Sequence, residues 1–246
     1  MKKIRIKVIR IGYIPYDINF QKITNNNSAL FEVDKEINDY SLPQDSQGNN
    51  WEYTDSQFKE LLPSDFEGDF LFAICNTSLE NNYYARRLTD NRIIFSLSTT
   101  SNILKTENIP IENLLLRMLY AYSLNFIRYD RRIPSKTEKT KFAHDETKGC
   151  LFDMNGYIPD IVHSCDSPII CDDCSVSLSN SKVPQDIIKK VKKELAKIKK
   201  NRYYKILTFV KKHPFISIMI TFVFGLIINI VSNIIWELFI KKILAE

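Results

Sequence analysis

The chain has 246 residues and a net charge of +5, with 44% hydrophobic and 26% charged residues. This composition is ordinary for a protein that buries a core, and the length allows one moderate domain with appendages or two small ones. The odd number of cysteines, five, does not suit a disulfide framework that pairs every cysteine.

The N-terminal stretch "MKKIRIKVIRIGYIP" is predicted to form a half-buried β-strand. Its apolar residues Ile4, Ile6 and Val8 alternate with charged ones, and the alternation resumes at Ile9 and Ile11 after a slip of one residue. The stretch has neither the continuous apolar core nor the small-residue cleavage site of a signal peptide. We therefore expect a cytoplasmic domain, and stable disulfides are rare in that compartment.

Residues 1–140 are predicted to form an α+β cytosolic domain with a small central sheet and helices. After the first strand we expect a short helix, two compact strands and a long helix, at residues 55–62, 69–76, 92–99 and 109–130. Cys75 lies in one of these strands and is interpreted as a small core residue. The chain contains no glycine-rich phosphate-binding loop and no nucleophile elbow.

Two tyrosines and two arginines stand between the compact strands, and they are Tyr83, Tyr84, Arg86 and Arg87. Aromatic and guanidinium side chains together can bind a phosphate group or a base, so these four are candidate ligand-binding residues. Paired aromatic residues and arginines also occur on ordinary protein surfaces, and this alternative stays open.

Residues 141–181 hold four of the five cysteines and two of the three histidines. A C-x2-C pair places two thiolates on one turn of backbone, and tetrahedral structural zinc needs four such ligands. The four expected ligands, in the spacing H-x5-C-x20-C-x2-C, are His144, Cys150, Cys171 and Cys174. Because this spacing is close to that between the two halves of a zinc ribbon, we predict one structural Zn²⁺ in a zinc-binding segment.

Several alternatives to this zinc site stay open. Cys165 and His163 are the substitutes if His144 or Cys150 is not a ligand. A redox C-x2-C pair usually opens a helix after a strand and has basic neighbours that lower the thiol pKa, and such neighbours are absent here. A catalytic zinc needs an open coordination position, and none is evident. Free thiols are the remaining interpretation.

Residues 182–212 are strongly basic, with twelve lysines and arginines against two acidic residues, whereas residues 1–181 carry 20 basic and 25 acidic ones. Pro184 suits a first helical turn, and apolar residues from Ile187 to Ile198 share one face, so we predict a basic juxtamembrane helix. Its lysines can contact anionic lipid or nucleic acid. An apolar run follows within about a dozen residues, which favours lipid, and nucleic acid is not expected as a partner.

Residues 213–246 are predicted to be a transmembrane tail anchor. The run from Phe215 to Ile240 has 26 residues with a single charge, Glu237, and about 20 apolar residues span a bilayer as a helix. A buried core helix is the alternative. The basic segment precedes the run and only two lysines follow it, so the positive-inside rule places residues 1–212 on the cytoplasmic side of the inner (plasma) membrane.

Small and polar residues recur at every fourth position of this run and lie on one ridge of the helix. They are Ser217, Thr221, Gly225, Asn229, Asn233 and Glu237. Small residues allow helices to approach closely, and polar residues form hydrogen bonds between helices in lipid, so we predict a homo-oligomer. Single polar residues that a long span tolerates are the alternative.

The order of an extended strand, "CNTSLENNYYARRLTDNRIIFSLST", a helix and a cysteine-containing segment over residues 68–174 resembles that of archaemetzincin-like zinc peptidases. Those enzymes carry HExxHxxGxxH on the helix, where histidines hold zinc and a glutamate activates water. The corresponding helix here, "ENLLLRMLYAYSLNFIRYD", contains no histidine, and His144 is followed by "DETKG". The resemblance therefore implies a degenerate zincin-like domain without peptidase activity.

The stretches "HDETKGCLFD" and "ICDDC" also resemble zinc-ribbon-like modules beside a membrane anchor in bacterial sequences, some of them in phage defence. Together these features predict a tail-anchored membrane protein that is not an enzyme. Its zinc-stapled cytosolic domain would sense an unidentified intracellular ligand or protein partner, and its span would oligomerise as an effector in antiviral defence. The alternatives are a membrane-tethered zinc-dependent hydrolase and a plain anchored adaptor.

Overall fold

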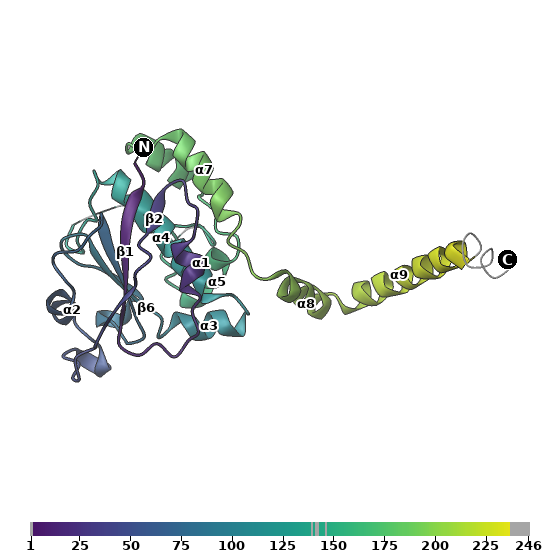
Figure 1. Cartoon of the computed structure of the whole chain (residues 1–246), viewed down its shortest axis with the longest axis horizontal. Coiled ribbons are helices and arrows are strands. Elements are labelled where there is room, and N and C mark those ends of the chain that lie inside the picture. Colours follow the sequence, from purple (N-terminus) through teal and green to yellow (C-terminus); the bar gives the residue numbers. More distant parts are fainter. Residues whose placement is uncertain (1, 139, 141–142, 146, 237–246) are drawn as a thin grey trace. The chain divides into compact units, whose positions relative to one another are not determined.

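The structure is a computed structural model that describes residues 2–138, 140, 143–145 and 147–236 (Figure 1). The chain divides into two compact units, of which one ends at Lys200 and the other begins at Asn201. The first unit contains a sheet and helices α1 to α7, and the second contains helices α8 and α9.

The first unit is built around a six-stranded sheet in the order β2-β1-β4-β6-β5, with β3 also paired to β1. Its strands are β1 (Ile4–Ile11), β2 (Phe31–Val33), β3 (Asn38–Tyr40), β4 (Phe70–Cys75), β5 (Ala85–Arg87) and β6 (Arg92–Ser96). All pairs are parallel except that of β5 with β6, which is antiparallel. β5 is therefore an antiparallel strand at one end of an otherwise parallel sheet.

Side chains of the central strands alternate between two apolar cores, one on each face of the sheet. In β4, Phe72 belongs to the larger core and its neighbours Leu71 and Ala73 to the smaller one. In β1, Val8 belongs to the larger core and Ile9 to the smaller one, while the register with β4 continues without a break. The slip in the apolar pattern of β1 therefore marks the point where its apolar side chains move from one face of the sheet to the other, and it is not a β-bulge.

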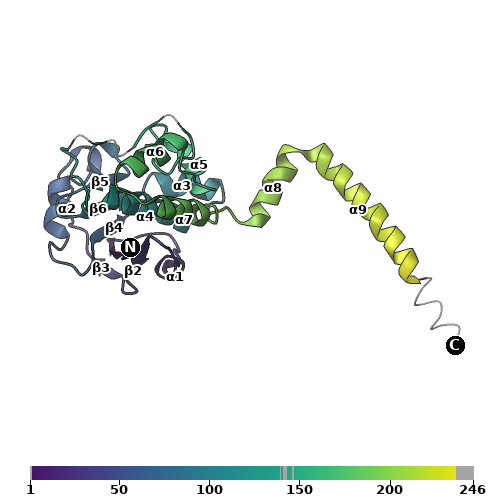
Figure 2. The same ribbon diagram turned by 90° about the horizontal axis from the view of Figure 1, so that it is seen from above.

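Helices cover both faces of the sheet, with α2 on one side and α4 on the other (Figure 2). The helices of the first unit are α1 (Phe20–Thr24), α2 (Asp55–Leu61), α3 (Thr100–Thr106), α4 (Ile111–Arg128), α5 (Ile161–Cys165), α6 (Asp172–Asn180) and α7 (Gln185–Leu195). Short 3-10 helices lie at Asn49–Trp51, Glu80–Asn82 and Ile158–Asp160. Every residue of α4 from Glu112 to Ile127 is buried, so this helix is the centre of the larger core.

Helix α7 packs onto the first unit and does not stand apart from it. Its buried apolar residues are Ile187, Ile188, Val191 and Leu195. The carboxylate of Glu194 accepts hydrogen bonds from the N–H of Ala29 and from the hydroxyls of Ser28 and Tyr120, each at 2.8 Å. The basic segment predicted as one juxtamembrane helix is thus two helices, α7 in the first unit and α8 in the second.

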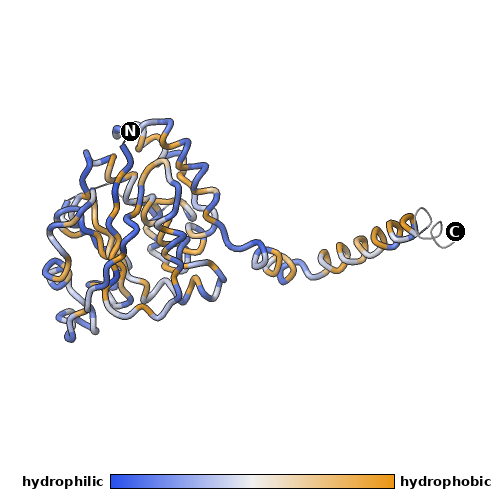
Figure 3. Tube along the Cα trace, viewed as in Figure 1, coloured by the Kyte–Doolittle hydropathy of each residue, from blue (hydrophilic) through white to orange (hydrophobic). Residues whose placement is uncertain are grey.

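The second unit contains α8 (Arg202–Lys212) and α9 (Pro214–Ile235). Helix α9 has 22 residues with a mean hydropathy of 2.4 in its apolar window, and none of that window is buried. Apolar residues follow the helix along its length (Figure 3). Among the described residues it is the one helix that is long and apolar enough to cross a membrane, by length and composition. The predicted run continued to Ile240, and its last four residues lie outside the described part.

The predicted mixture of a central sheet and helices is confirmed, and the four elements predicted within residues 55–130 correspond to α2, β4, β6 and α4. The α+β class is corrected, because four of the five strand pairs are parallel. Such a sheet is buried on both faces, which explains the nearly continuous apolar sequences of β4 and β6. The proposed boundaries at residues 140, 181 and 212 stay predictions.

Candidate metal centre

Four side chains predicted as zinc ligands come together in the first unit. They are His144, Cys150, Cys171 and Cys174, and one ligand atom from each lies within 4.8 Å of the others. The first two stand on a loop after α4, and the last two stand at the beginning of α6. The structure therefore brings two parts of the segment 141–181 together at one point.

Short backbone pairings hold the loop that carries the first two ligands. His144 forms an isolated bridge with Asp153, and Cys150 forms one with Ile169, two residues before Cys171. Gly149 directly precedes Cys150 and has a φ of +82°, a left-handed conformation that glycine adopts without strain. This local geometry places the Cys150 thiol next to the start of α6.

Cys171 caps helix α6. Its sulfur accepts a hydrogen bond of 3.4 Å from the N–H of Cys174, so the C-x2-C spacing puts both sulfurs at the helix N-terminus. The two thiols therefore stand side by side, where one metal ion can reach both.

The distances between the ligand atoms fit a tetrahedral zinc ion. Nε2 of His144 lies 3.3 Å from Sγ of Cys150 and 3.6 Å from Sγ of Cys171. The sulfurs of Cys150 and Cys174 are 3.9 Å apart. With Zn–S bonds of about 2.3 Å and Zn–N bonds of about 2.0–2.1 Å, a tetrahedron has N–S and S–S edges of roughly 3.5 and 3.8 Å. The cluster is therefore suited to bind Zn²⁺, and its four protein donors complete the shell of a structural site.

The contact between Cys150 and Cys174 shifts the pKa values of the two thiols in opposite directions. Their sulfurs are 3.9 Å apart, and the hydrogen bond between them lowers the pKa of Cys150. The same contact raises the pKa of Cys174, because a second thiolate would lie beside the first. A metal ion is bound by thiolates, so a thiol that carries a proton must release it when a metal ion binds.

The two substitute ligands are not part of this cluster. Cys165 is buried on α5, where burial raises its pKa to about 12, and His163 on the same helix is exposed. Cys75 is also buried, with a pKa raised by burial to about 12, and it packs in the smaller core as predicted. Neutral buried thiols of this kind behave as small apolar residues.

The four residues predicted to bind a ligand lie in two different places. Tyr83, Tyr84 and Arg87 line a cavity of about 290 Å³ beside α4. The guanidinium of Arg86 instead contacts the carboxylate of Asp55, with Nε–Oδ1 and Nη2–Oδ2 distances of 2.9 and 2.7 Å. Arg86 therefore stands outside the cavity and holds β5 to the beginning of α2.

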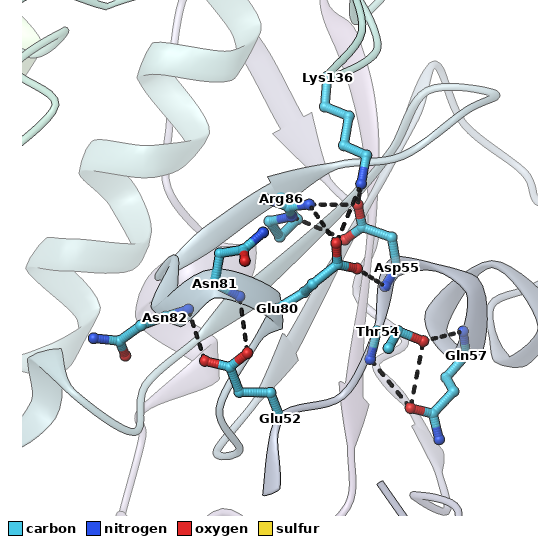
Figure 4. Close-up of polar contacts among 9 residues, drawn as sticks. All are labelled: Glu52, Thr54, Asp55, Gln57, Glu80, Asn81, Asn82, Arg86 and Lys136. Carbon is cyan, nitrogen blue, oxygen red and sulfur yellow. Dashed lines mark hydrogen bonds and ion pairs between the residues drawn. The ribbon is translucent and has the colours of Figure 1, made fainter. Parts of the chain in front are cut away.

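The Arg86 contact is the centre of a buried ion-pair cluster (Figure 4). Lys136 also contacts the Asp55 carboxylate, and Glu80 lies 3.6 Å from both Arg86 and Lys136. The side chains of Arg86 and Asp55 are only 9% and 6% exposed. Burial works to raise the pKa of Asp55, but hydrogen bonds from Arg86 and Lys136 outweigh it and leave the pKa below its ordinary value.

Two further sets of polar contacts lie beside this ion-pair cluster, at the loop before β5 and at the start of α2 (Figure 4). The carboxylate of Glu52 accepts hydrogen bonds from the N–H groups of Asn81 and Asn82, both of which have positive φ. Thr54 and Gln57 form a capping box at the start of α2. These contacts fix the loop before β5, which carries the two tyrosines of the cavity.

Sequence reasoning missed Arg117 of α4, which lines the same cavity. This arginine is 2% exposed, and its Nη2 donates a 2.7 Å hydrogen bond to the carbonyl of Asp153. The available signal was a basic residue inside the apolar run "LLLRMLY", because charged residues are almost never fully buried unless they are paired.

Five of the six residues predicted for self-association lie on α9, and Glu237 lies outside the described residues. The amide of Asn233 donates to Asn229 at 3.2 Å, and the hydroxyl of Thr221 donates to the carbonyl of Ser217 at 2.9 Å. A side chain added at Gly225 would meet nothing within 4 Å. These residues form one ridge of an exposed helix, and self-association stays a prediction.

Comparisons with known proteins give one distant likeness. No protein-family model matches the chain, and no curated protein matches it. Among solved structures, the chain is similar to archaemetzincin from Methanopyrus kandleri, with 14% sequence identity and a TM-score of 0.47 over 73% of this chain and 95% of that one. The predicted resemblance is thus supported as a distant one.

The prediction that the chain is not an enzyme is contradicted and is withdrawn, since the distant likeness is to archaemetzincin.

Proposed function

We propose that the protein is a single-pass protein of the inner (plasma) membrane. Helix α9 anchors it, and the zinc-held first unit lies in the cytoplasm, where it binds an intracellular ligand or protein partner. The observation that carries this proposal is the exposure of α9. Its apolar window has no buried residue, whereas the first unit buries its own apolar residues. A lipid environment stabilises such a helix.

The length of α9 supports a membrane span. Its 22 residues correspond to about 33 Å at 1.5 Å per residue, and the hydrocarbon core of a bilayer is about 30 Å thick. No charged side chain stands between Pro214 and Ile235, so no ionised group would have to enter the lipid in this stretch.

Helix α8 supports the cytoplasmic orientation of the first unit. Its exposed apolar and aromatic residues are Tyr203, Ile206, Phe209 and Val210. Lysines stand among them and at the end of the helix, directly before α9. Apolar residues beside lysines are typical of helices at a lipid interface, and basic residues next to a span favour the cytoplasmic side.

Zinc in this proposal has a structural role. It would tie the loop of His144 and Cys150 to the start of α6, where Cys171 and Cys174 stand. The folded chain brings these ligands together, so the free energy of metal binding adds to the stability of the fold. The first unit would then present its surface and cavities as a rigid body.

Two further parts of the proposal are self-association and a biological role. Self-association is supported by the row of small and polar residues on one ridge of an exposed helix. A role as a membrane effector in antiviral defence rests on the sequence resemblance alone. Both are kept as predictions.

Membrane fractionation of a double variant tests the anchor. Aspartate at the centre of a span costs about 2.5–3.5 kcal/mol, so Ile220→Asp with Ile227→Asp should release the chain from the carbonate-washed membrane fraction. The matched control, Ile220→Leu with Ile227→Leu, should stay in that fraction like the wild type. Carbonate extraction of the wild type, or full retention of the aspartate variant, contradicts the proposal.

A protease-protection measurement tests the orientation separately. An N-terminal tag on the wild-type chain should resist external protease on intact spheroplasts and should be cleaved after the inner membrane is permeabilised. Cleavage on intact spheroplasts contradicts the cytoplasmic placement while leaving the anchor itself in place.

A further inference from the structure

A cavity of about 290 Å³ beside α4 in the first unit has no role in the proposed function. The edge strand β5 and the preceding tyrosines form one wall, Arg117, Met118, Ala121 and Tyr122 of α4 form the second, and residues 151–154 form the third. We call it the Arg117 cavity. The zinc cluster lies outside it, although the third wall begins directly after Cys150.

Two arginines bring positive charge into this cavity. Arg117 is 2% exposed, and its Nε has no hydrogen-bond partner among the described residues. Arg87 lines the cavity from β5 and donates to the hydroxyl of Thr140 at 3.4 Å. Both arginines and Tyr122 line the same cavity, so two guanidinium groups stand in its wall.

The negative charge in the cavity wall is smaller than the positive charge. Asp153 is the one acidic residue that lines it among the described residues, against the two arginines. One oxygen of its carboxylate, Oδ1, accepts a 2.8 Å hydrogen bond from the N–H of Asn155. The guanidinium of an arginine stays charged in a protein, so the cavity keeps a net positive charge.

The remaining lining is apolar and aromatic. Tyr84 and Tyr122 contribute rings, and Met118, Leu151 and Phe152 contribute apolar surface. The hydroxyl of Tyr84 donates to the carbonyl of Met154 at 3.0 Å, which fixes its ring in place. An apolar cavity with a few convergent polar groups is the usual form of a small-molecule site, and about 290 Å³ is near the lower end of their size range.

We propose that the Arg117 cavity binds a small organic anion that has one planar ring and one phosphate or carboxylate group. The anionic group is received by Arg87 and Arg117, and the ring packs against Tyr84, Tyr122 and Met118. A guanidinium recognises phosphate and carboxylate by paired hydrogen bonds, and a planar ring suits an aromatic wall. The small volume excludes a folded peptide as occupant. This inference goes beyond the proposed function, because the cavity lies wholly within the first unit and does not depend on the anchor.

Ligand-observed saturation-transfer NMR on the full chain in lipid nanodiscs tests the proposal, with empty nanodiscs subtracted. The probes are phenyl phosphate, benzoate, inorganic phosphate and the neutral benzyl alcohol. Phenyl phosphate or benzoate should bind with a Kd on the order of 1 mM, as expected for a fragment of this size. Benzyl alcohol and inorganic phosphate should each bind at least about tenfold more weakly, because each lacks one half of the ligand.

Three variants locate the binding. Arg87→Ala should raise the Kd of the anionic ring probe at least about tenfold, and Arg5→Ala, which removes an exposed arginine outside the cavity, should leave it unchanged. Ala121→Leu fills the cavity from α4 without changing charge and should abolish binding. Near-ultraviolet circular dichroism shows whether each variant is folded. If Ala121→Leu is not folded, it is replaced by Met118→Phe, which also fills the cavity.

The outcomes separate the parts of the proposal. No binding of either anionic ring probe overturns it. Equal binding of benzyl alcohol overturns the anion recognition, and equal binding of inorganic phosphate overturns the ring recognition. Binding that survives both Arg87→Ala and Ala121→Leu places the probe elsewhere and overturns the site.

Stronger binding of phenyl phosphate than of benzoate identifies phosphate as the anionic group. None of these results depends on whether α9 spans the membrane, so a failure here is distinct from a failure of the anchor.

Discussion

Helices α4 and α9 are the two longest helices of the described chain, and they differ in what covers them. Helix α4 has 18 residues and buries those from Glu112 to Ile127 against the sheet and other helices of the first unit. Helix α9 has 22 residues and buries none. Both helices are rich in leucine, isoleucine or phenylalanine, so apolar content alone does not distinguish a core helix from a membrane span.

Charge is what distinguishes the two helices. The two buried charged side chains of α4 each have a partner in the protein: Glu112 accepts from the N–H of Asn19 at 2.7 Å, and Arg117 donates to the carbonyl of Asp153 at 2.7 Å. Helix α9 carries no charged side chain. Buried charges need specific partners that only a folded core supplies, whereas an uncharged apolar helix suits lipid. The predictions below test this separation of a packed unit from a span.

The largest expected effect is the loss of a zinc ligand. Cys171→Ser should remove zinc and destabilise the first unit by more than about 4 kcal/mol, because the metal ties the loop of Cys150 to α6. Unfolding followed by near-ultraviolet circular dichroism measures it. The matched control Cys165→Ala changes another buried cysteine and should keep its zinc. Membrane insertion should be unchanged in both variants, and a loss of insertion in Cys171→Ser would show that the two units are not separate.

The second effect concerns the buried ion pair of the first unit. Asp55→Asn should cost roughly 3 kcal/mol, because it leaves Arg86 without its closest carboxylate. Chemical denaturation measures the cost. The exposed pair of Arg10 and Asp39 provides the control, and Asp39→Asn should cost about 0.5 kcal/mol or less. Equal costs for both variants contradict the role of burial.

The Asp55 contribution has a defined pH dependence. Its pKa in the folded protein lies below the ordinary value of 3.8, so the stabilisation is fully present above that value and is lost as the pH falls through the lowered pKa. The difference in unfolding free energy between wild type and Asp55→Asn should therefore be constant from neutral pH to about pH 5 and should shrink below about pH 4. A difference that grows on acidification has the wrong sign for this account.

The third effect concerns the attachment of α7 to the first unit. Glu194→Ala removes the acceptor of three hydrogen bonds, from Ala29, Ser28 and Tyr120, and should cost about 2 kcal/mol. Hydrogen exchange of the α7 amides should increase in the variant. The control Asp186→Ala on the same helix removes an exposed ion pair with Lys190 and should cost about 0.5 kcal/mol. Unchanged exchange in Glu194→Ala contradicts the packing of α7.

The smallest effect concerns the ridge of α9. Asn229→Leu with Asn233→Leu should weaken self-association in vesicles by about 1 kcal/mol and leave insertion intact, because interhelical hydrogen bonds in lipid are of that size. Energy transfer between labelled chains measures it. Ile230→Leu with Ile234→Leu, outside the ridge, should have no effect. If the asparagine variant associates as the wild type does, the ridge serves no contact between helices.

The sequence predicted the elements whose signal is local. The alternation in β1, the apolar runs of β4 and β6, the long helix α4 and the apolar run of α9 all follow from periodicity or length. The parallel pairing was not predictable from these segments alone, because a strand buried on both faces has the same sequence in several sheet orders. The short strands β2, β3 and β5, with three residues each, carry too few side chains to give a pattern.

For the candidate sites too, the sequence predicted only what depends on local spacing. The C-x2-C spacing predicted the zinc cluster because both thiols stand on one helical turn, and the structure brings His144 and Cys150 to them. The sequence did not predict which of Arg86 and Arg87 lines the cavity. Neighbouring residues of a strand point to opposite faces, and only the packing of α2 shows that Arg86 contacts Asp55. The partner of Arg117 was not predictable either, because it is a backbone carbonyl far along the chain.

The most direct test of a zinc-held unit joined to a membrane anchor is metal analysis of the full-length wild-type chain, extracted from membranes and purified under reducing, anaerobic conditions. We expect about one zinc ion per chain, and replacement by Co²⁺ should give the absorption of a tetrahedral site with thiolate ligands. A zinc content near zero in the folded chain, or a chain that is absent from the membrane fraction, is the opposite result and excludes this arrangement.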